Sequence, residues 1–413
     1  MDPVVHPYRI IRRIADGSSG TVYEAVHPGL QRSVALKVLH RHVSSQAETV
    51  ARFENEARVL ARIEHPHVVR VHDVNVQTEH PFIAMELVPG ESLDLKLARD
   101  GRFSFDDTAE LADQILSVLE VAHAQNIVHR DLKPANLMLD GAHDRPFVRV
   151  VDFGIALLQS QTDATRLTAA GQQLGTAAYM SPEQVSGEAL DARSDLYSLA
   201  CVLFELLTAR PPFVATQPVH VLSAHLFREP PTFSELGVSN VPRAFESVLR
   251  RALSKPRDAR FSSAREFRSA LAASRAGGDA REVDFEAAHE FVAAEVDAPA
   301  VKLALDGAAP ALTAQLREAL TAIGAREAAN EKEGVVLVAG ADAEATLKRC
   351  QQLVSEDAAR LVLMCGSDDD VSLMARAIGH GVFDFIALPL DAPEAGRRVV
   401  RALRFAQERR RTS

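Results

Sequence analysis

The chain has 413 residues, of which 47% are hydrophobic and 25% are charged, and its formal net charge is −10. This composition is typical of a soluble globular protein with two or three domains, and it excludes a chain that is disordered throughout. The net acidity argues against nucleic-acid binding as the main function, and three separated cysteines suit a reducing cytoplasm better than a disulfide framework or a zinc site.

No basic and apolar leader precedes the first predicted strand, so we expect no secretory signal. A glycine-rich turn follows at residues 14–22, which read Ile-Ala-Asp-Gly-Ser-Ser-Gly-Thr-Val. Gly17 and Gly20 would let backbone amides approach a phosphate group. Ala15 stands where the common glycine-rich pattern has its first glycine, so this turn does not establish nucleotide binding by itself.

A buried strand, Val34-Ala35-Leu36-Lys37, ends in a lysine. Lysine is rare in this chain, with only seven among 46 basic residues. A strand core excludes lysine unless a carboxylate pairs with it. Glu56 lies on the helical pattern that follows the strand, and we expect it to be the partner of Lys37.

Two later segments of the chain carry polar residues of a kind that could bind metal and phosphate. After the apolar run 82–90, which ends in Pro89-Gly90, residues 129–136 read His-Arg-Asp-Leu-Lys-Pro-Ala-Asn. Asp152-Phe153-Gly154 follows a predicted strand at 148–151. Carboxylate and amide oxygens suit Mg²⁺, and an aspartate can accept a proton from a hydroxyl group.

Three segments farther along complete the pattern: Gly175-Thr176 with Ser181-Pro182-Glu183-Gln184, residues 194–199 around Asp195, and residues 256–261, which include Arg260. The most apolar stretch, 196–207, is too short to span a bilayer and contains a glutamate, so we expect no membrane span.

These segments, in this order, resemble the protein kinase family over residues 8–274, and they are similar to the bacterial eukaryotic-like (Hanks-type) serine/threonine kinases. The resemblance implies a bilobal α+β fold, with an N-lobe over about 8–86 and a C-lobe over about 91–274. It also implies transfer of the γ-phosphoryl group of ATP to serine or threonine hydroxyls of proteins, including autophosphorylation, with ATP and Mg²⁺ or Mn²⁺ as cofactors.

The resemblance assigns roles to individual residues. Asp131 would accept or orient the substrate hydroxyl proton, Lys133 would neutralise charge on the γ-phosphate, and Asn136 and Asp152 would bind magnesium. Lys37, held by Glu56, would contact the α- and β-phosphates. The expected ATP-binding residues are Ala15, Gly17, Gly20, Val22, Ala35, Lys37, Met85, Glu86, Val88 and Met138.

Other residues would have structural roles. Glu183 would form a buried ion pair with Arg260, Asp195 would anchor the catalytic loop, and His129 and Phe153 match the regulatory-spine positions. Aminoglycoside-type phosphotransferases share part of the motif set but lack the Ser-Pro-Glu segment and the Arg260 partner. A catalytically weak ATP-binding scaffold remains the alternative, because of Ala15 and an altered activation loop.

The activation loop lacks the usual phosphate acceptors. Related bacterial kinases carry a Thr-x-Thr pair where this chain reads Ala-Gly-Gln at 170–172. Arg130 implies a cationic pocket for a loop phosphate. We hypothesise that Thr168 is the acceptor or that the loop needs no phosphate, and we expect Thr176 to contact the Asp131/Lys133 loop rather than to act as a switch.

Residues 275–300 form an acidic linker that opens with Arg275-Ala276-Gly277-Gly278. Apolar residues recur in it at near-helical spacing, namely Phe285, Ala288, Val292 and Val296. A solvated linker and an amphipathic helix docked on a domain both remain open.

A second rhythm begins at Val301. Apolar runs at 301–305, 335–339, 360–365 and 384–388 alternate with helical patterns such as 312–323 and 343–353, which predicts a small doubly wound parallel sheet. Together with the segment 379–386, Gly-His-Gly-Val-Phe-Asp-Phe-Ile, this makes residues 301–410 resemble the response-regulator receiver, a flavodoxin-like α/β domain.

The residues that receiver phosphorylation needs are missing. Ala339 occupies the acceptor position, Cys365 the hydroxyl position and Leu388 the lysine position, while Asp306 is the only acid near the first strand. Asp342 could replace the acceptor only in another register. We therefore predict a pseudo-receiver domain that binds a partner but does not accept phosphate.

The C-terminal segment is strongly basic, with arginines at positions 397, 398, 401, 404, 409, 410 and 411. A solvated helix end and a docking surface both fit this pattern. The expected partners are protein substrates with serine or threonine acceptors, and a second subunit or signalling protein bound through the receiver-like domain, with no nucleic acid.

Overall fold

The computed structural model separates into two units, residues 1–283 and 284–413. The parts of the chain that it describes, apart from a few isolated positions, are 5–17, 20–41, 47–153, 174–215, 218–275, 300–322, 325–328, 335–340, 342–357, 360–367 and 384–388. None of the helices within these ranges combines the length and the apolar composition that a membrane span requires.

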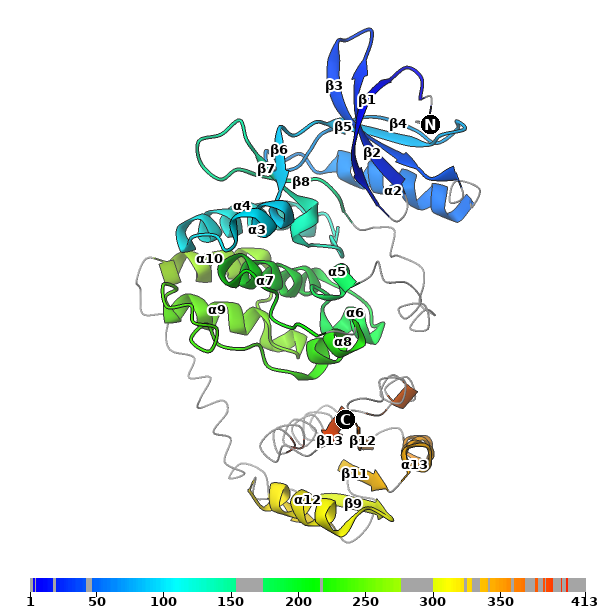
Figure 1. The fold of residues 1–413 in the computed structure, drawn as a ribbon, viewed down its shortest axis with the longest axis vertical. Helices are drawn as coiled ribbons and strands as arrows, with labels where there is room; N and C mark the ends of the chain where they lie inside the picture. Colours follow the sequence, from blue (N-terminus) through cyan, green and yellow to red (C-terminus); the bar gives the residue numbers. More distant parts are fainter. Residues whose placement is uncertain are drawn as a thin grey trace. The chain divides into compact units, whose positions relative to one another are not determined.

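The first unit begins with an antiparallel five-stranded sheet of order β1-β2-β3-β5-β4 and one long helix, α2 (Figure 1). The strands and the helix are β1 (Arg9–Asp16), β2 (Gly20–His27), β3 (Arg32–Leu39), β4 (Val71–Asn75), β5 (Phe82–Glu86) and α2 (Ala47–Arg62). One face of β3 buries Val34, Leu36 and Val38 against β2 and β5, and β-branched residues favour such a pleated, packed surface.

The helical part of the same unit contains α3 (Leu93–Asp100), α4 (Phe105–Ala124), α5 (Leu174–Ala177), α6 (Pro182–Ser186), α7 (Ala192–Thr208), α8 (Pro218–Phe227), α9 (Arg243–Ala252) and α10 (Ala264–Arg275), with the short 3₁₀ turns η1 (Pro134–Asn136) and η3 (Arg257–Ala259). A small sheet of order β6-β7-β8 lies beside them, formed by β6 (Gly90–Ser92), β7 (Leu137–Asp140) and β8 (Val148–Val150). Side-chain caps mark where two helices begin: Ser104 accepts the Asp107 amide, and Asp191 accepts the Arg193 amide.

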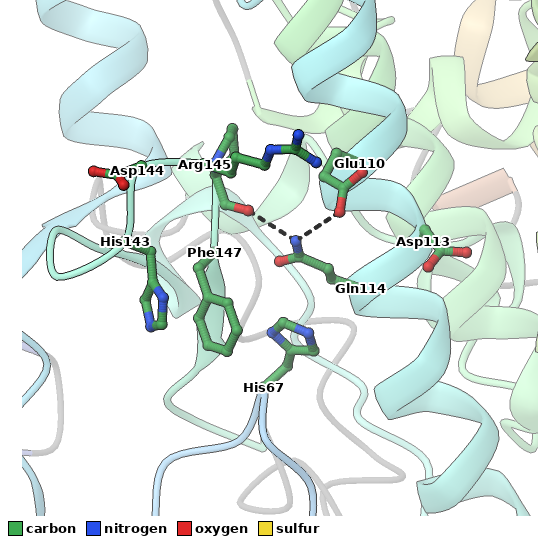
Figure 2. A pocket seen from close by; sticks show the side chains of 9 residues that line it. His67, Glu110, Asp113, Gln114, His143, Asp144, Arg145 and Phe147 are labelled. Atoms are coloured by element: carbon green, nitrogen blue, oxygen red, sulfur yellow. Dashed lines mark hydrogen bonds between the residues drawn. The ribbon is translucent and has the colours of Figure 1, made fainter.

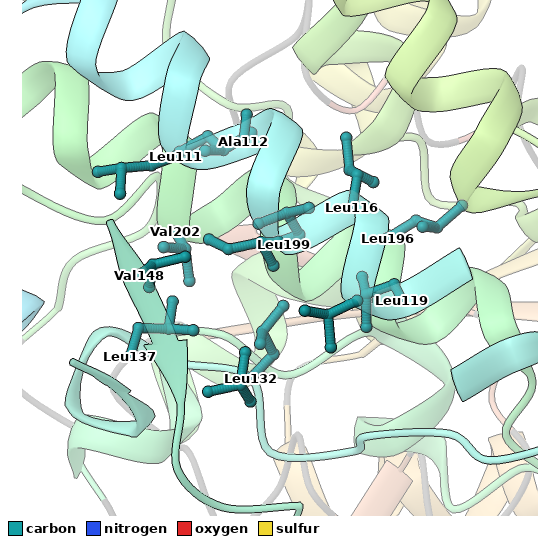
Figure 3. Packing of buried hydrophobic residues seen from close by; sticks show 14 of the residues in the cluster. Leu111, Ala112, Leu116, Leu119, Leu132, Leu137, Val148, Leu196, Leu199 and Val202 are labelled. Atoms are coloured by element: carbon teal, nitrogen blue, oxygen red, sulfur yellow. The ribbon is translucent and has the colours of Figure 1, made fainter. Parts of the chain in front are cut away.

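The core of this part is the contact between α4, α7 and the small sheet (Figure 3). Leu116 of α4 and Leu199 of α7 are wholly buried in it, as are Leu137 of β7 and Val148 of β8. Burying one such side chain contributes about 1.5–3 kcal/mol. The same core therefore fixes the segment between α4 and β7 and the segment after β8, which carry most of the polar motif residues.

The second unit contains a parallel five-stranded sheet of order β10-β9-β11-β12-β13. Its elements are β9 (Ala300–Asp306), α12 (Pro310–Ala322), β10 (Arg326–Glu327), β11 (Val335–Gly340), α13 (Ala343–Glu356), β12 (Leu361–Ser367) and β13 (Asp384–Leu388). Alternate strand residues enter two separate clusters, one with α12 and one with α13, so both sheet faces are covered.

One detail of this unit differs from the sequence prediction. The edge strand β10 was not predicted, because two exposed residues give no periodic signal. As the apolar run 360–365 predicted, Cys365 lies within a strand, β12, where it is 4% exposed. Almost all of the acidic linker and all seven arginines of the C-terminal segment lie outside the described residues.

Candidate active site

Lys37 lies between two carboxylates that come from different elements. It is on β3, and its Nζ is 2.5 Å from Oε1 of Glu56 on α2 and 3.0 Å from Oδ2 of Asp152, just after β8. The Lys37 side chain is only 15% exposed. The ion pair therefore links α2, the large sheet and the small sheet at one point.

The charges of this cluster depend on one another. Burial disfavours the Lys37 ammonium, but Asp152 and Glu56 outweigh it and raise the pKa of Lys37 above its ordinary value. Burial and the Asp152 charge raise the pKa of Glu56, whereas Lys37 holds the pKa of Asp152 below its ordinary value despite burial. Asp152 is thus the more acidic of the two carboxyl groups that contact Lys37.

One oxygen of Asp152 has no partner within the described residues. Its Oδ2 accepts from Lys37, but Oδ1 is buried without a hydrogen bond. Asn136, at the end of η1, is also buried. Its Nδ2 donates to the backbone carbonyl and to the side chain of Asp131. A free carboxylate oxygen together with an amide oxygen fits Mg²⁺, which binds few protein ligands and completes its shell with phosphate and water oxygens.

The loop before η1 is fixed by one buried carboxylate. Asp195, 1% exposed on α7, accepts the backbone amides of His129 (2.8 Å) and Arg130 (2.9 Å), and its Oδ2 is also 2.8 Å from Nε2 of His123. Arg130 has a positive φ of 71°, a conformation that L-residues adopt only when their surroundings impose it. Asp195 supplies that constraint and so orients Asp131.

Asp131 is held by two side chains of its own loop. Nζ of Lys133 lies 2.8 Å from Oδ2 of Asp131 and 3.2 Å from Oγ1 of Thr176, and Nδ2 of Asn136 lies 3.1 Å from Oδ2 of Asp131. Lys133 therefore connects the loop to the segment around α5. Asp131 and Lys133 are 19% and 21% exposed, so both remain accessible to a substrate.

The face of the sheet that carries Lys37 also carries the residues expected around a nucleotide base. Val22 pairs with Lys37, and Ala35 pairs with Met85, across antiparallel strands. Residues directly opposite each other share a face, as do Ala35 and Lys37 two positions apart. Ala35 and Met138 are half-buried against the same core.

The glycine-rich turn joins β1 and β2. A Cβ at Gly20 would lie 2.4 Å from the Val38 carbonyl oxygen, so only glycine fits there, and the Gly17 amide donates to the Gly20 carbonyl at 2.9 Å. Ala15 is on β1 at a register shift and is exposed. The missing first glycine is therefore accommodated without a clash.

The strand β5 leads into the connection between the two sheets. Met85 is 7% and Val88 8% exposed. The Glu86 amide already donates to the Arg70 carbonyl at 2.8 Å. Any backbone donor for a ligand in this segment must therefore come from beyond Glu86.

A second buried ion pair supports the loop from the other side. Arg260, with a fully buried side chain, donates to both oxygens of Glu183 (2.8 and 2.9 Å), and Ser194 donates to Glu183 at 2.6 Å. Gln184 then donates to the Arg130 carbonyl at 2.6 Å. The segment 181–184 is in this way bonded to the Asp131 loop.

Two buried rings fill the space behind the motif residues. His129 and Phe153 are wholly buried, with ring centroids 4.5 Å apart. Thr168 and Gly154, which the sequence analysis singled out, lie outside the described residues, so the expectation about Thr168 has no structural counterpart here.

The sequence analysis missed several residues of this region, above all His123, Gln114 and Arg149. Gln114, 7% exposed on α4, accepts the Val148 amide and donates to the Pro146 carbonyl, both at 2.8 Å. Many of their partners, such as the Pro146 carbonyl for Gln114 and the Pro66 carbonyl for Arg149, are 32 and 83 positions away, and no local pattern indicates such contacts. A polar residue within an apolar run, such as Arg149 between two valines, was the only signal available.

The arrangement agrees with a comparison of the sequence with known families. Residues 8–271 match the protein kinase domain. The chain belongs to the protein kinase family. It is 38% identical over 274 residues to the serine/threonine-protein kinase pkn3 of Myxococcus xanthus, and 40% identical over 276 residues to PknJ of Mycobacterium tuberculosis.

Those alignments cover 65% and 66% of this kinase-family chain and 50% and 46% of the relatives, so the chain spans about half the length of the curated relatives that it matches. Among solved structures, the kinase domain of Mycobacterium tuberculosis PknI is similar with a TM-score of 0.51 and 28% identity, covering 66% of this chain and 98% of that one. All three similarities concern the kinase domain.

Proposed function

We propose that the chain is a serine/threonine protein kinase that transfers the γ-phosphoryl group of ATP to protein hydroxyls, including its own. The observation that carries this proposal is the Lys37–Glu56–Asp152 cluster in the same unit as the Asp131–Lys133–Asn136 loop. Positioning and electrostatic stabilisation account for almost all catalysis of phosphoryl transfer, and these residues supply both.

In the proposed reaction, Asp131 accepts the proton of the substrate hydroxyl. The hydroxyl oxygen bonds to the γ-phosphorus as the bond from the γ-phosphorus to ADP breaks. Lys133 neutralises charge on the transferred group, and its contact with Thr176 keeps it beside Asp131. Lys37 binds the α- and β-phosphates. Asp152 and Asn136 would hold Mg²⁺, which supplies positive charge at the phosphate oxygens.

For the nucleotide base, we propose a pocket formed by Val22, Ala35, Met85 and Met138. Val22, Ala35 and Met85 lie on the same face of the large sheet as Lys37, and Met138 is half-buried against the core that contains Met85, which supports this assignment. Because the Glu86 amide is engaged, Val88 would provide the backbone donor to adenine, and Glu86 its carbonyl. Ala15, Gly17 and Gly20 would lie over the phosphates.

The test is incubation of the full chain with γ-labelled ATP and Mg²⁺, followed by phosphoamino-acid analysis. We expect acid-stable label on serine or threonine. No label should be transferred when EDTA is added before ATP to remove the metal. Label on tyrosine alone would contradict the serine/threonine assignment. Nucleotide binding without any transfer would instead support the alternative, a weakly active ATP-binding scaffold, for which the alanine at position 15 is the supporting observation.

We also propose that Arg130 receives a phosphate from the activation loop. Its Nε is buried without a hydrogen-bond partner in the described part of the chain, and burial lowers the pKa of its guanidinium. A phosphate group would neutralise the charge of the Arg130 guanidinium and accept hydrogen bonds from its N–H groups. Thr168 is the proposed acceptor, and phosphopeptide mapping that finds modification only outside 160–176 would exclude it.

For the second unit, we propose a flavodoxin-like pseudo-receiver domain over 301–410, joined to the kinase domain (8–274) by the linker 275–300. Its support is the strand order β10-β9-β11-β12-β13, which corresponds to the order 2-1-3-4-5 of doubly wound domains that bind ligands at the carboxyl ends of their strands. We propose that it binds a signalling protein or a second copy of the chain in the cytoplasm.

A further inference from the structure

Arg149, the middle residue of β8, contacts three separate segments of the chain. Its Nη2 donates to Oε1 of Glu86 at 3.0 Å, its Nη1 donates to the Pro66 carbonyl at 2.6 Å, and its Nε lies 3.5 Å from Oδ2 of Asp140. The side chain is 17% exposed, and its guanidinium lies 5.4 Å from the Phe147 ring. The partly buried Arg149 guanidinium thus lies against the carboxylates of Glu86 and Asp140 and the carbonyl of Pro66.

Glu86, which ends β5, also makes two contacts with Arg70. Oε2 of Glu86 accepts the Arg70 amide at 3.3 Å, and the Glu86 amide donates to the Arg70 carbonyl at 2.8 Å. The segment 66–70 that follows α2 is itself bonded to β8, through Val150 to the His67 carbonyl and Val69 to the Val150 carbonyl. Arg149 therefore ties the side chain of Glu86, at the end of β5, to a segment that is already fixed.

The loop that leads into β8 is held by Gln114 of α4 and by His67 (Figure 2). Gln114 binds the backbone on both sides of Phe147, and His67 lies 2.9 Å through Nδ1 from the Val148 carbonyl. Phe147 packs between His67 and His143, with ring centroids 4.2 and 4.1 Å away. A pocket of about 540 Å³ lies beside this loop, and Arg149 is not among the residues that line it.

We propose that Arg149 is a positioning residue for adenine binding: through Glu86 it holds the backbone that binds the base, without touching the nucleotide. The proposal rests on the proposed function, since it names how that same site keeps its affinity for ATP. A fixed binding backbone need not be ordered when the nucleotide binds, so the cost of binding is lower. This gain in binding free energy is the same for bound ATP and for the transition state of the transfer. It therefore lowers KM for ATP and leaves kcat unchanged.

The experiment measures binding and kinetics of the full-length protein with Arg149→Met, which keeps an apolar stem against Phe147. We expect Kd for MgATP and KM for ATP to rise about tenfold, with kcat within about twofold of wild type. Mg-tripolyphosphate, which lacks the base, should bind equally well to both proteins. Arg149→Lys, which retains the charge near Glu86, should recover part of the loss.

Arg268→Met is the matched control, because it also removes an arginine from a carboxylate, Asp113, in the same unit but away from β5. We expect unchanged affinity for both ligands. The inference would be overturned if Arg149→Met bound MgATP as tightly as wild type, or if its affinity for Mg-tripolyphosphate fell as much as its affinity for MgATP. Neither result would affect the proposed function. A wild-type protein that binds no adenine nucleotide would overturn the proposed function as well.

Discussion

The Lys37 side chain is largely buried, and neighbouring carboxylates offset the cost of burying its charge. An isolated ammonium in a strand core would lose its proton, but the Asp152 and Glu56 carboxylates keep the pKa of Lys37 raised. The ammonium is therefore present throughout the neutral pH range. Arginine would not fit equivalently, because its planar fork is wider than a compact ammonium.

Replacing Lys37 with methionine tests this at the residue scale. We expect kcat/KM for ATP to fall by at least about 100-fold, because the phosphate contact and the charge that holds Asp152 are both lost. Steady-state phosphorylation of a generic protein substrate measures the effect. Lys96→Met is the control, since Lys96 pairs with Asp100 at the surface of α3, and it should stay within about twofold of wild type. Equal losses in both variants would contradict the assignment.

At the scale of elements, two buried ion pairs connect segments that would otherwise move apart. Lys37 joins β3, α2 and the end of β8, and Arg260 joins α6 to the segment after α9. The Arg260 contact also reaches the Asp131 loop, through Gln184 and the Arg130 carbonyl. Breaking a buried pair by removing one partner typically costs about 3–5 kcal/mol, because the other charge stays buried.

We therefore predict that Glu183→Gln lowers the free energy of unfolding by about 3–5 kcal/mol at pH 7. Burial would raise the pKa of Glu183, but Arg260 and Ser194 hold it below its ordinary value of 4.5. The pair's contribution is thus complete above pH 4.5 and is lost as pH falls through the lower folded-state pKa. The gap between wild type and variant should narrow below pH 4.5.

Urea unfolding followed by circular dichroism at pH 7 and at pH 3.5 measures this gap. Asp258→Asn is the control, because Asp258 also pairs with an arginine, Arg193, but is 95% exposed. Its cost should stay below about 1 kcal/mol at both pH values. A Glu183→Gln protein as stable as the control at pH 7, or a gap that widens in acid, would contradict the account.

At the scale of the whole molecule, the two units differ in how much their sequences reveal. The motif residues of the first unit could be predicted because members of the protein kinase family carry particular residue types in a fixed order along the chain. Arg149, Gln114 and His123 could not, since their contacts form only after distant segments pack. In the second unit, buried apolar runs indicated the parallel sheet, but the two-residue strand β10 was too short to detect.

The second unit should accept no phosphate if it is a pseudo-receiver. We predict that full-length Asp131→Asn protein incubated with labelled acetyl phosphate gains no acid-labile label, because β11 ends in Val-Ala-Gly and offers no acceptor carboxylate. Gel electrophoresis under neutral conditions measures the label, with an authentic receiver protein as the positive control. Stable labelling within 301–413 would contradict this prediction and point to Asp342.

The central claim is that Asp131 performs chemistry in a kinase site. Phosphate transfer from γ-labelled ATP, compared between wild type and Asp131→Asn, tests it most directly. The substitution keeps the size of the side chain but removes the proton acceptor, so we predict at least about 100-fold slower transfer with ADP affinity within about threefold of wild type. Equal transfer by both proteins, or none by wild type, would contradict the account.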